Sequence, residues 1–197
     1  MKKFLVTAAL SLFFLIYQPA QAQDLEAAFG LGTLTAPSPS SATGDYSPVT
    51  LSGGLYPSFN ANFFLRHRLG FGGELAWRAK QNLYLGYQPY RPIIYDFNAV
   101  WAPHIAKGTW AELMAGVGAE SLHFYGFTSC GFTGCTNYVS SNHFLGHFGA
   151  GLRYNIWGHM FVRPEAHLYL IHNNLEFSSP RATRFGVSIG YSFSPSD

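Results

Sequence analysis

The last stretch of the chain, residues 184–193, alternates between apolar and polar side chains without a break. One face carries Phe185, Val187, Ile189, Tyr191 and Phe193. The other face carries Arg184, Gly186, Ser188, Gly190 and Ser192. Because successive side chains of a strand point to opposite faces, this pattern predicts a β-strand with one apolar side. An aromatic residue, Phe193, ends the apolar side near the C-terminus. Because all five side chains of this side are apolar, the fold must provide apolar surroundings for it.

The N-terminus has the three parts of an export signal. Met1–Lys3 is a short basic region, Phe4–Ile16 is apolar, and Ala20-Gln21-Ala22 is a small-residue cleavage motif. We therefore predict a signal peptide over residues 1–22 and a single exported domain over residues 23–197. No cysteine stands at the cleavage point, so a lipid anchor is not expected.

The composition argues against a water-soluble domain. The chain has 12 Lys and Arg against 10 Asp and Glu, and removal of Lys2 and Lys3 with the signal leaves 12 − 2 = 10 basic residues. The neutral mature chain offers no basic surface for nucleic acid. Charged residues make up 11% and aromatic residues 17%, whereas a soluble domain carries about 25% charge. No segment after the signal has the roughly 18 apolar residues of a membrane helix, so any membrane span must consist of strands.

Eight alternating segments follow the signal peptide, and their apolar faces are nearly free of charge. They cover residues 25–33, 58–65, 69–79, 93–101, 111–119, 144–156, 162–170 and 185–193. These lengths are close to the roughly 9–11 residues with which a tilted strand crosses a bilayer.

The connections between these segments alternate in length. Residues 66–68, 103–109 and 157–159 form short connections, and Trp101, Trp110 and Trp157 flank them. The long connections are residues 37–49, 80–91, 126–141 and 172–183. Short turns on one side, long loops on the other and aromatic residues at the interface are typical of transmembrane barrels. An unpaired backbone group in hydrocarbon costs several kcal/mol, so the eighth strand must pair with the first. The sequence predicts an all-β, eight-stranded antiparallel up-and-down transmembrane β-barrel.

Two residues conflict with this pattern. Pro164 falls inside the seventh segment, where its missing N–H removes a bond of the ladder. A β-bulge at Pro164 would accommodate it. Phe64 is expected to point inward, against the apolar-outward pattern of its segment.

The polar face holds about half of the charges of the mature chain, and all its basic residues are arginines. It comprises Glu26, Glu74, Arg78, Asp96, Glu112, Glu120, Arg153, Arg163, Glu165 and Arg184. Since isolated charges in a narrow lumen are costly, we expect an ion-pair network, with inward glycines leaving room for the long side chains. Eight strands enclose a space that side chains fill, so no open pore is expected. A soluble lipocalin-like barrel would have the opposite arrangement of faces.

The histidines suggest a metal site at first sight. His143 and His147 share a strand face with Arg153, and His123 and His167 lie on neighbouring segments. Residues four apart on a strand are about 13 Å apart, too far to bind one ion. We therefore predict lumen histidines that are satisfied by hydrogen bonds, and no metal.

An enzyme is a further alternative. Lipid A deacylases of the outer membrane place a His-x-Ser motif and a later Glu in this part of a barrel, and the chain has His172 followed by Glu176. The position two after His172 is Asn174, and Ser178 and Ser179 lack the spacing, so the nucleophile of that motif is missing. An outer-membrane protease would need acidic pairs in the loops, and Asp45 and Glu176 do not supply them.

Cys130 and Cys135 enclose a Gly-containing turn in the third long connection. Two cysteines so close together in an exported chain predict a disulfide. The chain-entropy estimate for so small a ring is about 2–3 kcal/mol. A redox motif would have the spacing CxxC, which this pair does not have.

Taken together, the signal peptide, eight alternating segments, alternating connection lengths and aromatic-terminated last strand resemble the small bacterial outer-membrane β-barrel family of the OmpA transmembrane domain and OmpX-like proteins. One departure is that Ser194-Pro195-Ser196-Asp197 follows Phe193. The resemblance implies a bacterial outer-membrane location and a structural or surface-interaction role of the external loops, without catalysis or cofactor. It also implies outer-membrane lipid as a partner, an unidentified extracellular ligand, and recognition of Tyr191 and Phe193 by the barrel-assembly machinery. A narrow gated channel and a lipid A-modifying enzyme are the alternatives.

Overall fold

The computed structural model describes residues 24–36, 50–65, 68–131, 134–174, 176–177 and 180–193, with only the backbone at residues 127–129 and 131. The predicted signal peptide, the first long connection (residues 37–49), Ser178, Ser179 and residues 194–197 lie outside the described residues. Within them, no helix is long and apolar enough to span a membrane.

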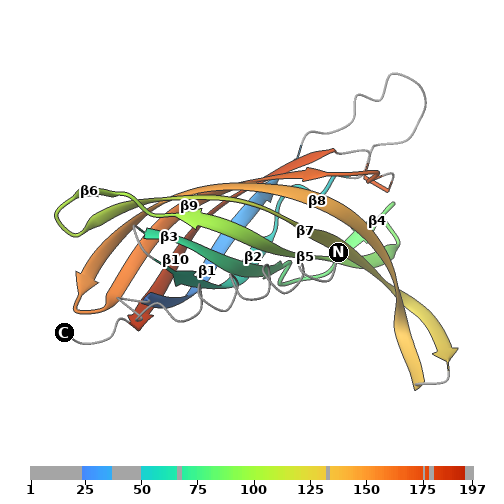
Figure 1. The fold of residues 1–197 in the computed structure, drawn as a ribbon. Helices are drawn as coiled ribbons and strands as arrows, with labels where there is room; N and C mark the ends of the chain where they lie inside the picture. The colour runs from blue at the N-terminus through green and yellow to red at the C-terminus, as the bar shows by residue number, and fades with distance from the viewer. Residues whose placement is uncertain are drawn as a thin grey trace, which may run out of the picture.

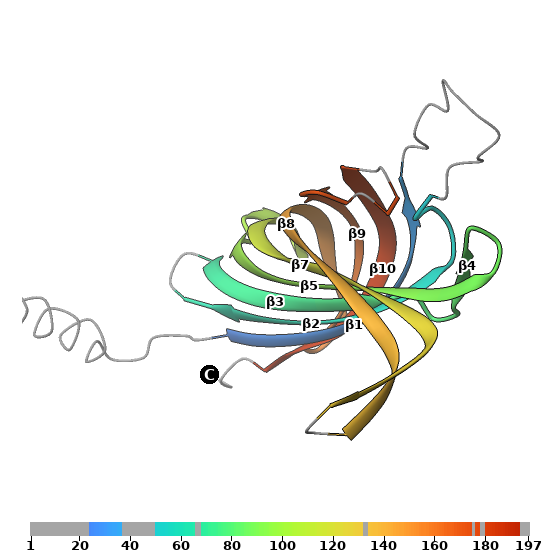
Figure 2. The same cartoon turned by 90° about the vertical axis from the view of Figure 1, so that its right-hand side faces the viewer.

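The described strands form a closed antiparallel barrel (Figures 1 and 2). Its eight staves are β1 (Asp24–Thr35), β2 (Leu55–Phe64), β3 (Leu69–Trp77), β5 (Gln88–Trp101), β7 (Thr109–Gly131), β8 (Gly134–Trp157), β9 (Met160–Ile171) and β10 (Arg181–Phe193). Two short strands, β4 (Asn82–Tyr84) and β6 (His104–Ala106), extend the hairpins at opposite ends of the barrel (Figure 1). The predicted fold class is confirmed.

The first and last strands close the barrel. β1 pairs with β10 from Leu25↔Phe193 to Thr35↔Thr183, and its other edge pairs with β2. Each of these eight strands has a neighbour on both sides, so the backbone N–H and C=O groups of the closed wall form hydrogen bonds within the sheet. A wall surrounded by hydrocarbon needs this, because unpaired backbone groups are costly there.

The two faces of the wall differ as the alternation predicts. The outward face carries exposed Phe29, Phe97, Phe148 and Val187 among many other apolar side chains. The inward face carries the buried polar residues described below. Phe64 points inward, as predicted, with 1% of its surface exposed.

The prediction of a third long loop is wrong. Residues 126–141 were expected to form a loop, whereas β7 and β8 continue through them as a hairpin that projects far beyond the wall (Figures 1 and 2). The pairing shifts register between Tyr125 and Ser129, where Gly126 has φ +100°. A positive φ is accessible to glycine at little cost, so the ribbon can bend there. The expected connections over residues 80–91 and 103–109 likewise contain β4 and β6.

Pro164 lies within β9 without a bulge. On one side it is opposite Val187 of β10. On the other side the β8–β9 ladder breaks after Gly151↔Glu165 and resumes in the same register at Tyr154↔Val162. The missing N–H is therefore accommodated by a local gap in the ladder rather than by an inserted residue.

Candidate functional site

All ten charged residues of the predicted network point into the barrel and are buried. Their exposed fractions lie between 0% for Glu112, Glu120 and Arg184 and 8% for Arg78. The strands place them there through their period of two, since each stands on the same face of its strand as the other inward side chains.

Arg153 and Glu26 form an ion pair on the side of the short turns. The guanidinium of Arg153 also lies over the rings of Phe161, at 4.5 Å, and Trp110, at 5.1 Å. Arg68 lies 5.5 Å from the same Trp110 ring. These cation–π contacts hold the arginine in place where few other polar groups reach it.

Arg163 occupies the middle of the lumen between two carboxylates. Its Nη1 donates to Glu112 Oε2 at 2.5 Å and its Nε donates to Glu165 Oε2 at 2.9 Å. Arg184 pairs with Glu74 and lies 3.6 Å from Glu165. Two arginines thus share Glu165, which links the pairs into one network.

His147 and His167 stack at the centre of this network. Their ring planes are 17° apart, and His147 Nε2 lies 2.9 Å from His167 Nδ1. On its other side, His147 Nδ1 contacts Asn98 Oδ1 at 2.7 Å. His143 and His123 lie elsewhere, and His123 stacks on Tyr138. Among the described residues, no group of three or more His, Cys, Asp or Glu side chains is arranged to hold a metal ion.

Two members of the predicted set interact with neutral groups. Arg78 donates to the hydroxyl of Tyr90 at 3.3 Å, and Glu120 accepts a hydrogen bond of 3.0 Å from Asn174. Asp96 lies 3.4 Å from His147. The charges are therefore joined through histidine, amide and hydroxyl groups as well as through direct ion pairs.

Apolar side chains cover this polar centre at both ends. The turn-end cluster consists of Phe64, Val100, Ala102 and Met114. The hairpin-end cluster consists of Leu34, Leu51, Tyr56, Tyr90, Ile94, Leu122, Leu145, Tyr169, Ile171, Phe177 and Ala182, with Ala36, Tyr84 and Phe124 packed against it. Apolar clusters therefore lie at both ends of the lumen, and the turn-end cluster draws its residues from the β2, β5 and β7 side of the barrel.

A second polar group lies beside the hairpin-end cluster. Ser141 Oγ donates to Glu176 Oε1 at 2.6 Å and lies 3.1 Å from His143 Nε2. His143 Nε2 lies 3.1 Å from Glu176 Oε2. We call these three residues the rim group. Partial burial raises the pKa of the Tyr84 hydroxyl, and the nearby carboxylate of Glu176 raises it further.

Sequence reasoning missed the rim group. It considered Glu176 with His172, but His172 is exposed and Asn174 is bound to Glu120. A Ser-x-His spacing on one strand face was visible at Ser141 and His143. Their common partner was not, because Glu176 is 35 residues away from Ser141 in the chain.

Comparison with known proteins identifies the family of this chain. Residues 6–193 match the family described as outer membrane protein beta-barrel domain. The chain belongs to this family. No curated protein matches the sequence.

Solved structures of outer membrane beta-barrel proteins share the fold at low sequence identity. Neisserial surface protein A has a TM-score of 0.59 at 9% identity, with 87% of this chain and 98% of that chain covered. The N-terminal β-barrel domain of Pseudomonas aeruginosa OprF has a TM-score of 0.54 at 11% identity, covering 88% and 100%. The Yersinia pestis attachment invasion locus protein Ail, in complex with the heparin analogue sucrose octasulfate, has a TM-score of 0.53 at 12% identity, covering 87% and 98%.

Membership of the outer membrane beta-barrel family indicates the bacterial outer membrane as the location and orients the molecule. Short turns of such barrels face the periplasm and long connections face the exterior. The end that carries β4 and the tip of the β7–β8 hairpin is then the outer end. Trp101 and Trp157 lie at the periplasmic end, with 48% and 81% of their surfaces exposed, where an aromatic girdle is typical.

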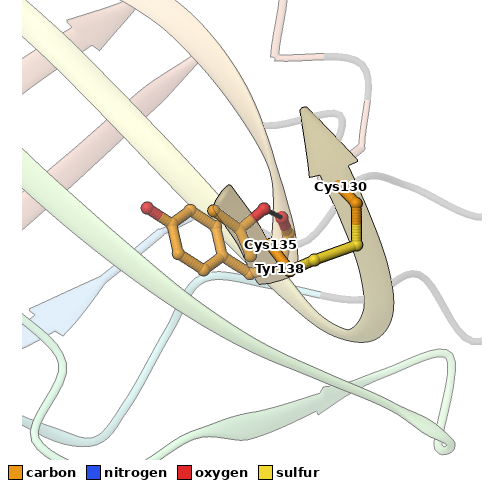
Figure 3. Close-up of a disulfide and its surroundings, with 4 residues drawn as sticks. Cys130, Cys135 and Tyr138 are labelled. Atoms are coloured by element: carbon orange, nitrogen blue, oxygen red, sulfur yellow. Dashed lines mark hydrogen bonds between the residues drawn. A yellow bond between two sulfur atoms is a disulfide. The ribbon is translucent and has the colours of Figure 1, made fainter. Parts of the chain in front are cut away.

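A disulfide joins Cys130 and Cys135 at the outer tip of the hairpin in this outer membrane beta-barrel (Figure 3). The two residues are directly paired across the hairpin, with their Cα atoms 4.0 Å apart. The bridge therefore fixes the strand pairing at a point far from the barrel wall.

Removal of this bridge is expected to loosen the tip alone. In a Cys130→Ser/Cys135→Ser variant, chymotrypsin should cleave near Tyr138 several-fold faster than in the oxidised protein. The unfolding temperature of the barrel should not change, because the ring encloses no residue of the wall. A large fall in unfolding temperature would show instead that the tip supports the barrel.

Proposed function

We propose that this protein is a closed outer-membrane barrel that acts as a surface-interaction protein through its β7–β8 hairpin. The observation that carries the proposal is the length of that hairpin. Pairing of β7 with β5 ends at Tyr90↔Phe124, and pairing of β8 with β9 ends at Leu145↔Ile171. β7 and β8 nevertheless continue to pair with each other up to Gly131↔Gly134.

The chemistry of the hairpin favours an uncharged partner. Residues 126–141 contain no Asp, Glu, Lys or Arg and are rich in Ser, Thr, Gly and aromatic residues. Hydroxyl and aromatic groups bind partners through hydrogen bonds and apolar contact rather than through charge. Ail carries a sulfated heparin analogue in its structure, whereas the uncharged hairpin of this chain favours neutral glycans or apolar protein surfaces.

The side chains in the lumen support a role without transport. An ion crossing the barrel would have to pass the hairpin-end cluster and the buried ion-pair network, and the turn-end cluster fills part of the lumen below them. The alternative, a narrow gated channel, requires the hairpin-end cluster and the ion pairs to move aside. Discrete conductance steps from the purified protein in a planar bilayer would support that alternative.

A trimmed hairpin tests the proposed interaction. We replace residues 126–137 by Asn-Gly, so that a two-residue turn joins the paired residues Tyr125 and Tyr138. Bacteria that display the wild-type protein should adhere to immobilised extracellular-matrix proteins or neutral glycans. The trimmed variant should lose most of that adhesion, while its barrel still folds.

The matched control changes the opposite end of the barrel. Replacing Lys107 by Asn alters a periplasmic turn and should leave adhesion unchanged. Equal adhesion by the wild-type and trimmed proteins would refute the role of the hairpin.

A further inference from the structure

The rim group has the components of a site for nucleophilic catalysis. It brings a hydroxyl, an imidazole and a carboxylate within hydrogen-bonding distance of one another at the outer end of the barrel. Ser141 is half-buried, the side chain of His143 is 9% exposed and that of Glu176 is 26% exposed. The group is therefore partly shielded from water and still open to a substrate.

The hydrogen bonds assign a role to each member. The shorter bond carries the hydroxyl proton of Ser141 to Glu176 at 2.6 Å. Because that proton is used, Ser141 Oγ accepts from the imidazole Nε2–H of His143, which lies 3.1 Å from both Ser141 Oγ and Glu176 Oε2 and is shared between them. A nucleophile needs a neighbouring base, and its leaving group needs an acid. Glu176 is placed as the base and His143 as the acid.

An apolar groove lies directly beyond the rim group. It encloses about 450 Å³ and is lined by Tyr84, Tyr87, Gln88, Phe124 and Val139. Val139 is two residues before Ser141, so both stand on one face of β8, about 7 Å apart along the strand. The cross-strand partner of Val139 is Phe124, and that of Ser141 is Leu122. The groove and the hydroxyl of Ser141 therefore lie on the same face of the paired β7 and β8, two residues apart along each strand.

The backbone beside Ser141 offers a donor for a developing negative charge. The β8–β9 ladder ends at Leu145↔Ile171, and beyond it the N–H of His172 donates to the carbonyl of Phe144. Alternate residues of an antiparallel strand direct their backbone groups to the same side. The N–H of Asn142 therefore points toward the edge that β9 leaves uncovered, next to the nucleophile, where it can stabilise an oxyanion.

We propose that Ser141, His143 and Glu176 form an esterase site whose substrate is a carboxylic ester with an apolar acyl chain, held in the Tyr84–Val139 groove. This activity goes beyond the proposed interaction role and uses residues outside the hairpin tip.

The reaction balances with water as the only co-reactant. Ser141 Oγ bonds to the acyl carbon while its proton passes to Glu176. The bond to the alkoxy oxygen then breaks, and that oxygen takes the proton of His143 Nε2 and leaves as the alcohol. Glu176 returns a proton to His143 across their 3.1 Å contact. Water then attacks the acyl-serine by the same route, which releases the carboxylic acid and restores the hydroxyl.

Covalent labelling of the full folded protein tests the nucleophile. A fluorophosphonate probe should label the wild-type barrel and the Ser140→Ala control, because Ser140 lies on the opposite face of β8. Ser141→Ala should not be labelled. Heat-dependent gel mobility of each variant shows that it has folded. A folded wild-type barrel that takes no label, or a Ser141→Ala variant that labels as well as the wild type, overturns the proposal.

Hydrolysis of 4-nitrophenyl esters in detergent micelles tests the other assignments. Ser141→Ala and Glu176→Gln should lower kcat/KM for the octanoate ester by about 100-fold or more, and Ser140→Ala should change it less than twofold. Val139→Trp should fill the groove and slow the octanoate far more than the acetate. Wild-type rates equal to those of Ser141→Ala, or equal loss of both esters in Val139→Trp, would contradict the site.

Discussion

Replacing Arg163 by methionine is expected to lower the free energy of unfolding by about 3–5 kcal/mol, the range seen when one partner of a buried ion pair is removed. The arginine is 1% exposed and donates to both Glu112 and Glu165. Methionine keeps much of the volume, so the loss reports on the charge. Urea unfolding in lipid vesicles, followed by tryptophan fluorescence, measures it.

Two further variants separate burial from charge. Arg68→Met removes an ion pair whose arginine side chain is 39% exposed, and its effect should stay within about 1 kcal/mol. The double variant Arg163→Met/Glu112→Gln also removes the carboxylate of Glu112, which loses its Arg163 partner in the single variant, and should recover part of the loss. Glu165 keeps its contacts with Arg184 and Ser188 in both variants. If Arg163→Met and Arg68→Met have the same small effect, the lumen charges are solvated rather than paired.

Gly118→Val is expected to destabilise the wall at a point where β5 and β7 lie close together. A Cβ at position 118 would overlap the carbonyl oxygen of Tyr95 and would lie 2.6 Å from the Cα of Asp96. Both are backbone atoms of the neighbouring β5, which have little freedom to move. Overpacking of this kind costs about 1–3 kcal/mol and occasionally more. The same urea titration should show this loss, or the variant should fail to fold.

Gly146→Val is the matched control. It also adds a branched side chain to a strand glycine, but no atom lies within 4 Å of the added Cβ. It should change stability by about 0.5 kcal/mol or less. Equal losses in both variants would show that strand glycines matter for their backbone freedom and not for the space beside them.

The strands of the barrel wall could be predicted from the sequence more accurately than the projecting β7–β8 hairpin or the side-chain contacts across the lumen. The period of two identified eight strands and the inward face because lipid and lumen impose opposite polarity on alternate residues. Residues 126–141 carry no such polarity, since both faces of the hairpin lie outside the membrane. Their strand structure comes from cross-strand pairing and the disulfide, neither of which leaves an alternating pattern.

Contacts between side chains across the lumen could not be predicted from the sequence, for a different reason. The distance of about 13 Å along a strand correctly separated His143 from His147. It gave no information on His167, which the β8–β9 register brings beside His147. The rim group likewise depends on where the chain after β9 returns to β8. Such neighbours follow from strand register and loop path, not from spacing along the chain.

The closing pair of strands has a consequence for the order of assembly. Arg184 belongs to the last strand, and its partners Glu74 and Glu165 lie on β3 and β9. Glu74 is therefore without this arginine until the C-terminal segment takes its place beside β1. A chain truncated before β10 would lack both the β1–β10 pairing that closes the barrel and the guanidinium of Arg184. Truncation therefore leaves an open wall and, in its interior, Glu74 without this partner.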